Sequence, residues 1–146
     1  MNQRDSSIDS LYLQELLNPI GYRKIVERLT LFLLSKRYLF DSICGSSYSS
    51  VLISPQIAYN LNKNFILIRK KNYPTSSNRM VEGYKNTKKY IIIDDLVETF
   101  SCVRRINKEM NKFAPNSICN GIFLYAQDQI QKPQKIDGIR VYFVKH

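Results

Sequence analysis

The feature that most constrains the fold is an alternation of short β-rich runs with helical stretches after residue 40. The runs predict five strands, at residues 40–44, 65–68, 90–93, 118–124 and 139–144. Apolar residues at helical spacing predict two helices between these strands, one containing Val51, Ile53, Ile57, Ala58 and Leu61 and the other Val103, Ile106, Met110 and Phe113. Strands that alternate with helices form a parallel sheet with right-handed crossovers. The sequence therefore predicts an α/β fold.

The N-terminal part of the chain has a different pattern and predicts two helices that pack together. One apolar stripe precedes Asn18 and Pro19 and consists of Ile8, Leu11, Leu13, Leu16 and Leu17. A second stripe follows Gly21 and consists of Ile25, Val26, Leu29, Phe32 and Leu33. The stripe residues are expected to serve as core or as dimer contact. The length of 146 residues suits a single domain over 1–146, with a helical segment at 1–38 and an α/β core at 39–146.

Charge and residue usage narrow the classes of function. The chain has 22 Lys and Arg against 12 Asp and Glu, a net charge of +10, which favours an anionic partner such as a phosphorylated small molecule, nucleic acid or a membrane surface. The apolar runs are too short to span a membrane, and the polar N-terminus lacks a signal-peptide pattern, so we expect a cytoplasmic protein. Three separated cysteines and a single histidine, His146, argue against a zinc site and a histidine-based triad.

The most informative stretch follows the third predicted strand. In parallel sheets, ligands bind at the carboxyl ends of strands, which makes residues 45–50, 69–83 and 94–102 the loops of interest. Asp94 and Asp95 end the buried run 90–93, where paired carboxylates can accept hydrogen bonds from vicinal hydroxyls or hold Mg²⁺. Hydroxyls at the following turn, before the next helix, suit a phosphate group. The alternative is that Asp95 or Thr99 only caps that helix.

This stretch resembles the signature with which type I phosphoribosyltransferases bind 5-phosphoribosyl 1-pyrophosphate (PRPP). Residues 40–50 look like the first strand and pyrophosphate loop of that family, and residues 66–71 look like the second strand with its basic end. Glu82 and Gly83 are similar to a pair found in orotate and adenine members. The resemblance implies a Rossmann-like parallel core, in which residues 1–38 form a helical hood.

The resemblance also implies a role for each candidate residue. Asp94 and Asp95 would hold the ribose hydroxyls, while Glu98 would either handle a proton near the base or be a solvated acid at the helix N-terminus. The 5′-phosphate would bind Thr99, Phe100, Ser101 and Cys102. Pyrophosphate would bind Gly45, Ser46, Ser47, Tyr48 and Ser49, helped by Arg69 and Lys70. The implied cofactor is Mg²⁺ carried with PRPP, and the implied partners are a nucleobase or nucleotide and a second subunit in a homodimer.

The match has departures that leave two functions open. Phe100 replaces a glycine of the family's phosphate loop, Cys102 replaces Thr or Ser, and Ser49 and Ser50 replace a Gly-Gly pair. The chain is therefore expected to be a phosphoribosyltransferase or a catalytically impaired regulator that binds PRPP or a nucleotide, with nucleic acid as a further partner. A basic set suits that partner or is a solvated face: Lys85, Lys88, Lys89, Arg104, Arg105, Lys108 and Lys112. Residues 71–79 are expected to form a lid.

Overall fold

The computed structural model describes residues 13–70, 79–95 and 99–145. In chain order the elements are α2 (Pro19–Leu34), a 3₁₀ turn η1 (Arg37–Leu39), β1 (Ser42–Gly45), α3 (Tyr48–Asn60), β2 (Asn64–Ile68), β3 (Val81–Glu82), β4 (Lys89–Asp94), α4 (Ser101–Phe113), β5 (Ile118–Leu124), β6 (Lys135–Ile136) and β7 (Ile139–Phe143). No helix in the described ranges is long and apolar enough to cross a membrane.

The predicted parallel α/β sheet is confirmed, with two additions. The seven strands have the order β3-β2-β1-β4-β5-β7-β6, and the five predicted strands, β1, β2, β4, β5 and β7, pair in parallel. The sequence did not predict β3 and β6, which pair antiparallel with β2 and β7 at the two edges. The expectation of a continuous loop at 69–83 was wrong at Val81–Glu82, because a strand of two residues is too short to show a period.

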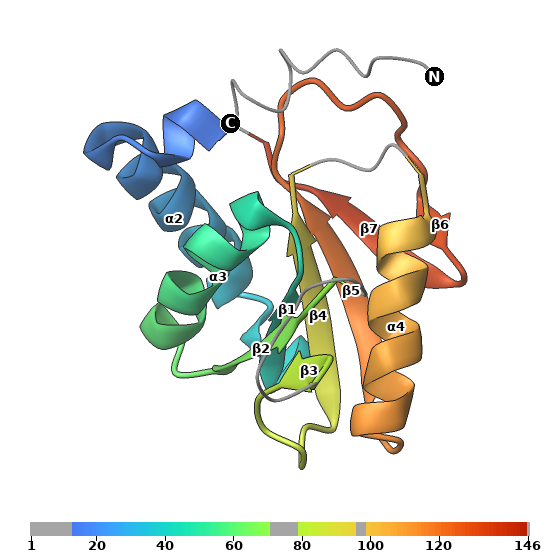
Figure 1. Ribbon diagram of the computed structural model, residues 1–146. Coiled ribbons are helices and arrows are strands. Elements are labelled where there is room, and N and C mark those ends of the chain that lie inside the picture. The colour runs from blue at the N-terminus through green and yellow to red at the C-terminus, as the bar shows by residue number, and fades with distance from the viewer. Residues whose placement is uncertain (1–12, 71–78, 96–98, 146) are drawn as a thin grey trace.

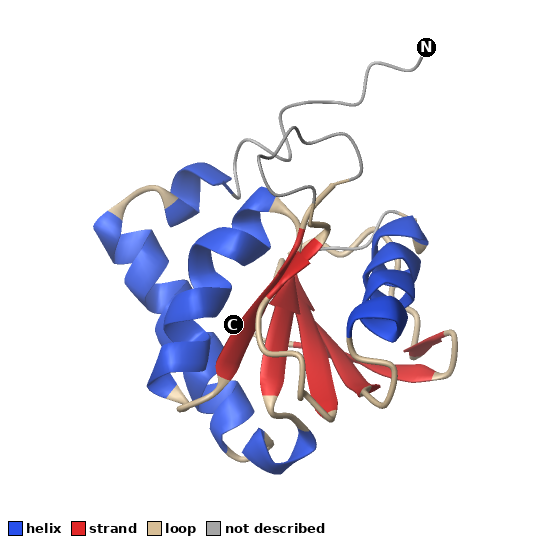
Figure 2. Ribbon diagram, turned by 60° about the horizontal axis from the view of Figure 1, so that its bottom comes forward, coloured by secondary structure: helices blue, strands red, loops and turns tan. Residues whose placement is uncertain are grey.

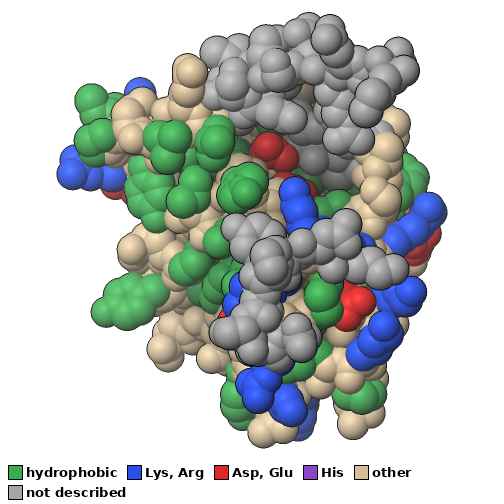
Figure 3. Space-filling model, in the orientation of Figure 1, with side chains coloured by type: hydrophobic (Ala, Val, Ile, Leu, Met, Phe, Trp, Pro, Cys, Tyr) green, Lys and Arg blue, Asp and Glu red, His purple; other side chains and the backbone are tan. Residues whose placement is uncertain are grey.

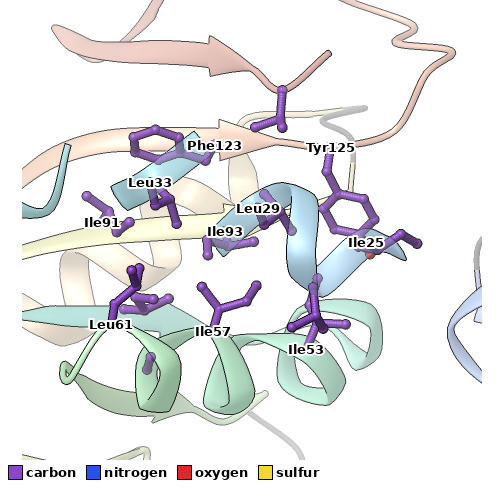
Figure 4. Close-up of a cluster of buried hydrophobic side chains, with 14 of the residues drawn as sticks. Ile25, Leu29, Leu33, Ile53, Ile57, Leu61, Ile91, Ile93, Phe123 and Tyr125 are labelled. Atoms are coloured by element: carbon purple, nitrogen blue, oxygen red, sulfur yellow. The ribbon is translucent and has the colours of Figure 1, made fainter. Parts of the chain in front are cut away.

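Helices cover both faces of the sheet, with α2 and α3 on one face and α4 on the other (Figures 1 and 2). Strand β4 contributes side chains to the core on both faces of the sheet, since successive side chains of a strand point to opposite faces. Ile91 and Ile93 join the core cluster with α2 and α3, as Figure 4 shows, whereas Tyr90 and Ile92 join the cluster with α4. This explains why residues 90–93 of the strand are all apolar and were predictable as fully buried.

The start of α2 is set by its capping residues. The side chain of Asn18 accepts a hydrogen bond of 2.8 Å from the backbone N–H of Gly21, and Pro19 follows at the first helical position, where its missing N–H costs nothing. Leu29 is fully buried against the sheet, so α2 shares a core with the α/β elements. Of the first predicted stripe, Leu16 is buried and Leu17 exposed, while residues 8–12 lie outside the described residues. The division at residue 38 stays a prediction.

Candidate active site at the carboxyl edge of the sheet

The connections of the sheet create one point where ligand-binding loops diverge. From β1 the chain passes through α3 to β2 on one side, and from β4 it passes through α4 to β5 on the other side. Strands β1 and β4 are neighbours, so the loops after Gly45 and Asp94 open away from each other. Open α/β sheets bind ligands at such a switch point.

The loop after β1 is bonded directly to the end of β4. Ser47 is the N-cap of α3 and accepts a hydrogen bond from the backbone N–H of Ser50 at 3.3 Å. The Ser47 hydroxyl donates to Asp94 Oδ1 at 2.7 Å. Ser49 is buried, with its oxygen 3.2 Å from that of Ser47, whereas Tyr48 is exposed. The predicted pyrophosphate loop and the predicted ribose site are therefore adjacent.

Gly45 has no room for a side chain. A Cβ at this position would lie 2.5 Å from Ser50 Oγ and 3.2 Å from the Phe65 ring. Ser50 is itself fixed, since it is buried and donates a hydrogen bond to the Ile93 carbonyl. Close contact between β1 and the first turn of α3 thus requires a glycine here.

The acid pair ends β4 with its two members in different environments. Asp94 is buried and Asp95 half-buried, and the backbone N–H of Asp95 donates to Asp94 Oδ1 at 2.9 Å. Burial, followed by the charge of Asp95, raises the pKa of Asp94 to about 7, although the hydrogen bond from Ser47 opposes this shift. Asp94 can therefore gain or lose a proton near neutral pH.

The N-terminus of α4 lies beyond the acid pair. Phe100 occupies the N-cap and its side chain makes no cap hydrogen bond, so neither Asp95 nor Thr99 is the N-cap residue of α4. The exposed hydroxyls of Thr99 and Ser101 lie 2.7 Å apart, and first-turn N–H groups of a helix without a side-chain cap are available to an anion. Phe100 packs against the core under α4.

Cys102 connects this helix to the acid pair. Its Sγ lies 4.0 Å from Asp94 Oδ2 and accepts a contact of 3.8 Å from the guanidinium of Arg105. Burial, and then the charge of Asp94, raises the pKa of the thiol, which keeps it protonated near neutral pH.

Two basic residues at the end of β2 lie near the predicted pyrophosphate loop. Arg69 forms an ion pair with Glu82 at 2.9 Å, and its buried Nε has no hydrogen-bond partner among the described residues. Lys70 is exposed, with its Nζ 5.7 Å from the centre of the Tyr48 ring. A cavity of about 200 Å³ opens here, lined by Ser46, Tyr48, Val51, Leu67, Arg69 and Lys70.

Arg105 is a site residue that the sequence interpretation placed on a general basic face. It is half-buried, and its guanidinium donates to Ser46 Oγ at 2.7 Å and to the Arg69 carbonyl at 2.8 Å. Its neighbour Arg104 faces outward and pairs with Asp137. Its spacing could have identified Arg105 as a site residue, because it lies four positions after Ser101 and therefore on the same side of α4.

Gln129 is a second residue near the acid pair, and no pattern in the sequence identifies it. Its amide nitrogen donates to the Asp95 carbonyl at 2.9 Å and to the Ala126 carbonyl at 2.8 Å. The buried Oε1 of Gln129 has no partner among the described residues. Gln129 therefore holds the backbone at Asp95 and retains one free acceptor.

Some predicted features cannot be placed. Glu98 and residues 71–78 of the expected lid lie outside the described residues. Among the residues that the structure describes, no three acidic, cysteine or histidine side chains lie close enough together to hold a metal ion. Magnesium commonly binds one or two carboxylates together with phosphate oxygens of a ligand, and the oxygens of Asp94 and Asp95 suit that mode.

Comparison with known proteins supports the interpretation of the sequence. No family model matches the chain. A curated adenine phosphoribosyltransferase from Lachnoclostridium phytofermentans is 29% identical over 114 residues, which are 68% of this chain and 65% of that relative. The chain thus spans slightly less than two thirds of the relative's length.

Solved structures share the fold at low sequence identity. The adenine phosphoribosyltransferase of Thermoanaerobacter pseudethanolicus has a TM-score of 0.65 and 18% identity, covering 89% of this chain and 83% of that one. The orotate phosphoribosyltransferase of Francisella tularensis has a TM-score of 0.58 and 16% identity, covering 77% and 58%. The resemblance to type I phosphoribosyltransferases of the adenine and orotate kinds is confirmed, and the α/β core has their fold.

Proposed function

We propose that the chain binds Mg-PRPP at the carboxyl edge of its sheet and transfers phosphoribose to, or from, a nucleobase. The observation that carries this proposal is the hydrogen bond of 2.7 Å from Ser47 to Asp94. It brings a serine-rich helix-entry loop against a buried acid, beside the uncapped N-terminus of α4. Sites for two phosphate groups, with a hydroxyl-binding acid pair between them, match the chemical groups of PRPP.

Each part of the site has a proposed role. Asp94 and Asp95 accept hydrogen bonds from the ribose hydroxyls. The backbone and hydroxyls of residues 99–102 bind the 5′-phosphate. The loop 45–49 binds pyrophosphate, with positive charge from Arg69 and Lys70. Arg105 is a positioning residue, because it donates to Ser46 in that loop and to the Arg69 carbonyl.

The reaction forms a bond between a ring nitrogen of the base and C1 of the ribose, and breaks the bond from C1 to the pyrophosphate oxygen. The electron pair of the broken bond leaves with pyrophosphate, and the base later loses the proton from its nitrogen. Such a reaction depends on holding the two reactants in line and on stabilising the leaving charge. When bound, Mg²⁺ would supply positive charge that stabilises the leaving pyrophosphate, and the carboxylates of Asp94 and Asp95 are the residues that would hold it.

A ligand-binding experiment tests the PRPP site. We expect millimolar Mg-PRPP to raise the melting temperature of the wild type, because a ligand that binds only the folded state stabilises it. The double variant Asp94→Asn with Asp95→Asn should lose this shift, while Lys85→Glu, a change of charge at an exposed position away from the site, should keep it. Absence of a shift in the wild type would refute the PRPP site.

A second candidate function is a catalytically impaired protein that binds PRPP or a nucleotide as a regulator. Phe100 favours it, since this ring occupies the N-cap of α4 and packs into the core where the family has glycine. Pyrophosphate release in the presence of Mg-PRPP and a panel of bases distinguishes the two functions. Adenine is the first base to test, since the curated relative is an adenine phosphoribosyltransferase. Binding of PRPP without turnover on any base would favour the regulator.

A further inference from the structure

A second cavity lies on the outward side of α4, away from Arg105. It has a volume of about 710 Å³, and its lining comes from α4, the start of β5 and the turn that joins β6 to β7. The part of the lining used below consists of Arg104, Asn107, Lys108, Asn111, Lys112 and Ile118. In Figure 3, Lys and Arg side chains lie along the side of the molecule that α4 forms. Cavities for small molecules commonly measure about 300 to 1,000 Å³, so this one has room for a molecule the size of a nucleotide.

The wall that α4 contributes is rich in hydrogen-bond donors. Its five residues between 104 and 112 follow one another at intervals of three, one, three and one, so they share one side of the helix. Three of them are cations, two are amides, and none is acidic. Lys108 and Lys112 are about 6 Å apart along the helix axis, a separation that allows both ammonium groups to contact one phosphate group.

Tyr90 determines which group Asn107 offers to a ligand. Tyr90 is buried, and its hydroxyl donates a hydrogen bond of 2.7 Å to Asn107 Oδ1. Because the oxygen of the amide accepts this bond, the nitrogen with its two N–H donors is the group left for a ligand. The amide is thus oriented before any ligand binds, which lowers the entropy lost on binding.

An ion pair joins the two walls of the cavity. Arg104 donates to both carboxylate oxygens of Asp137, at 2.9 and 3.1 Å, and so connects α4 to the turn between β6 and β7. Lys112 contacts Glu109 at 3.7 Å, but the Lys112 side chain is 65% exposed, and such surface pairs are weak. The lining contains three cations against one acid, so its net positive charge favours an anionic ligand.

The lining also has an apolar part. Ile118 is 63% exposed, and half-buried Ile139 belongs to the same lining. The Ser117 hydroxyl donates to the Ala114 carbonyl at 2.7 Å, so its proton is already used. The cavity therefore combines a cationic part, an amide part and an apolar part, which suit a phosphate, a polar sugar and a base.

We propose that this cavity is a second binding site, which takes a nucleotide with its phosphate at Lys108 and Lys112 and its base against Ile118 and Ile139. A nucleic-acid strand fits less well, because proteins that bind single strands stack bases on exposed aromatic rings, whereas Tyr90, the aromatic residue of this lining, is buried. The proposal does not depend on PRPP binding or on catalysis, since none of these residues contributes to the candidate active site.

Nuclear magnetic resonance of the ¹⁵N-labelled full chain tests the site residue by residue. Titration with adenosine 5′-monophosphate (AMP) should produce saturable changes at the side-chain amides of Asn107 and Asn111 and at the backbone amides of 117–119, with a Kd below about 1 mM. Adenosine lacks the phosphate and inorganic phosphate lacks the base. Each should therefore bind here at least about tenfold more weakly than AMP.

Variants of the two lysines test the role of charge. Lys108→Gln with Lys112→Gln should weaken AMP binding at these signals by about tenfold or more, because hydrogen bonds to charged groups are among the strong ones. The matched control is Arg23→Gln with Lys24→Gln, which removes two positive charges from exposed positions of α2, on the other face of the sheet. This control should bind AMP as the wild type does. The spectrum of each variant also shows whether it is folded.

The same spectra separate this site from the candidate active site, where AMP binding would change signals of residues 45–49 and 99–102. Asp94→Asn with Asp95→Asn should remove those changes and leave the ones at Asn107 and Asn111. AMP-induced changes confined to the active-site loops would overturn the proposal. So would inorganic phosphate that binds here as tightly as AMP, or single-stranded RNA that changes the Asn107 and Asn111 signals when AMP does not.

Discussion

The pKa of Asp94 makes a quantitative prediction about stability. The group has a pKa of about 7 in the folded protein and about 3.9 in an unfolded chain. Between these values the folded state holds a proton that the unfolded state releases, so the unfolded state is favoured as pH rises. The stability that protonated Asp94 contributes is fully present below about pH 4 and is lost as pH rises through about 7.

The magnitude follows from the difference in pKa. About three units at about 1.36 kcal/mol each correspond to about 4 kcal/mol of unfolding free energy. The variant Asp94→Asn lacks this titration and retains an oxygen that can accept the Ser47 hydrogen bond of 2.7 Å. We therefore expect the stability of the wild type, relative to Asp94→Asn, to fall by up to about 4 kcal/mol between about pH 4 and about pH 8.5.

Urea unfolding of both proteins across this pH range measures the difference. Asp128→Asn changes the same kind of group at an exposed position and controls for the loss of one acid. Ser47→Ala removes a hydrogen bond that lowers the pKa of Asp94, and should move the pH transition further upward. A difference between wild type and Asp94→Asn that does not vary with pH, or one that grows in favour of the wild type at high pH, would refute the reasoning.

Three further predictions concern the surroundings of the acid pair. Gly45→Ala should cost about 1 to 3 kcal/mol of stability in urea unfolding, because its Cβ would lie 2.5 Å from Ser50 Oγ, and the cost should shrink when Ser50→Ala removes that oxygen. Arg105→Met should leave the protein folded but lower its stability by about 1 to 3 kcal/mol in the same assay. It should also weaken Mg-PRPP binding in calorimetry, because Ser46 and the Arg69 carbonyl lose their hydrogen-bond donor. Arg104→Met, on the outward side of α4, is the control. Phe100→Gly should lower stability, since the ring packs in the core. It should also tighten Mg-PRPP binding, since a glycine lets the backbone approach a phosphate closely; unchanged affinity would show that Phe100 does not restrict binding of the 5′-phosphate.

The parts of the fold that the sequence predicted are those with a strong period or a strong local signal. The run that became β4 was predictable because Ile91, Ile92 and Ile93 are buried by helices on both faces. The strands β3 and β6 contain two residues each, and their pairing is decided by their neighbours in the sheet. Gly83 shows the same limit, because its need for glycine comes from its φ of 153° and from close contact with Ile66 on the adjacent strand, which only the folded structure fixes.

The site was predictable where motifs are continuous and not where side chains converge from distant elements. Asp94 and Ser47 were both identified, but the hydrogen bond between them joins residues 47 positions apart. Arg105 was grouped with other basic residues because sequence alone did not show which side of α4 faces the predicted pyrophosphate loop. Gln129 comes from the segment after β5 and contacts Asp95 only through backbone carbonyls, an interaction that leaves no residue pattern.

The hydrogen bonds around Asp94 indicate how the substitution at Phe100 affects binding and catalysis. Arg105 donates to Ser46, Ser47 donates to Asp94, and the backbone of Asp95 donates to Asp94. These bonds connect α4, the predicted pyrophosphate loop and the acid pair before any ligand binds. The loss of conformational entropy when a ligand orders such loops is therefore reduced. The substitution at Phe100 affects the entrance to α4 and breaks none of these bonds. Binding of PRPP should therefore tolerate this departure better than catalysis, which depends on finer alignment of the reacting atoms.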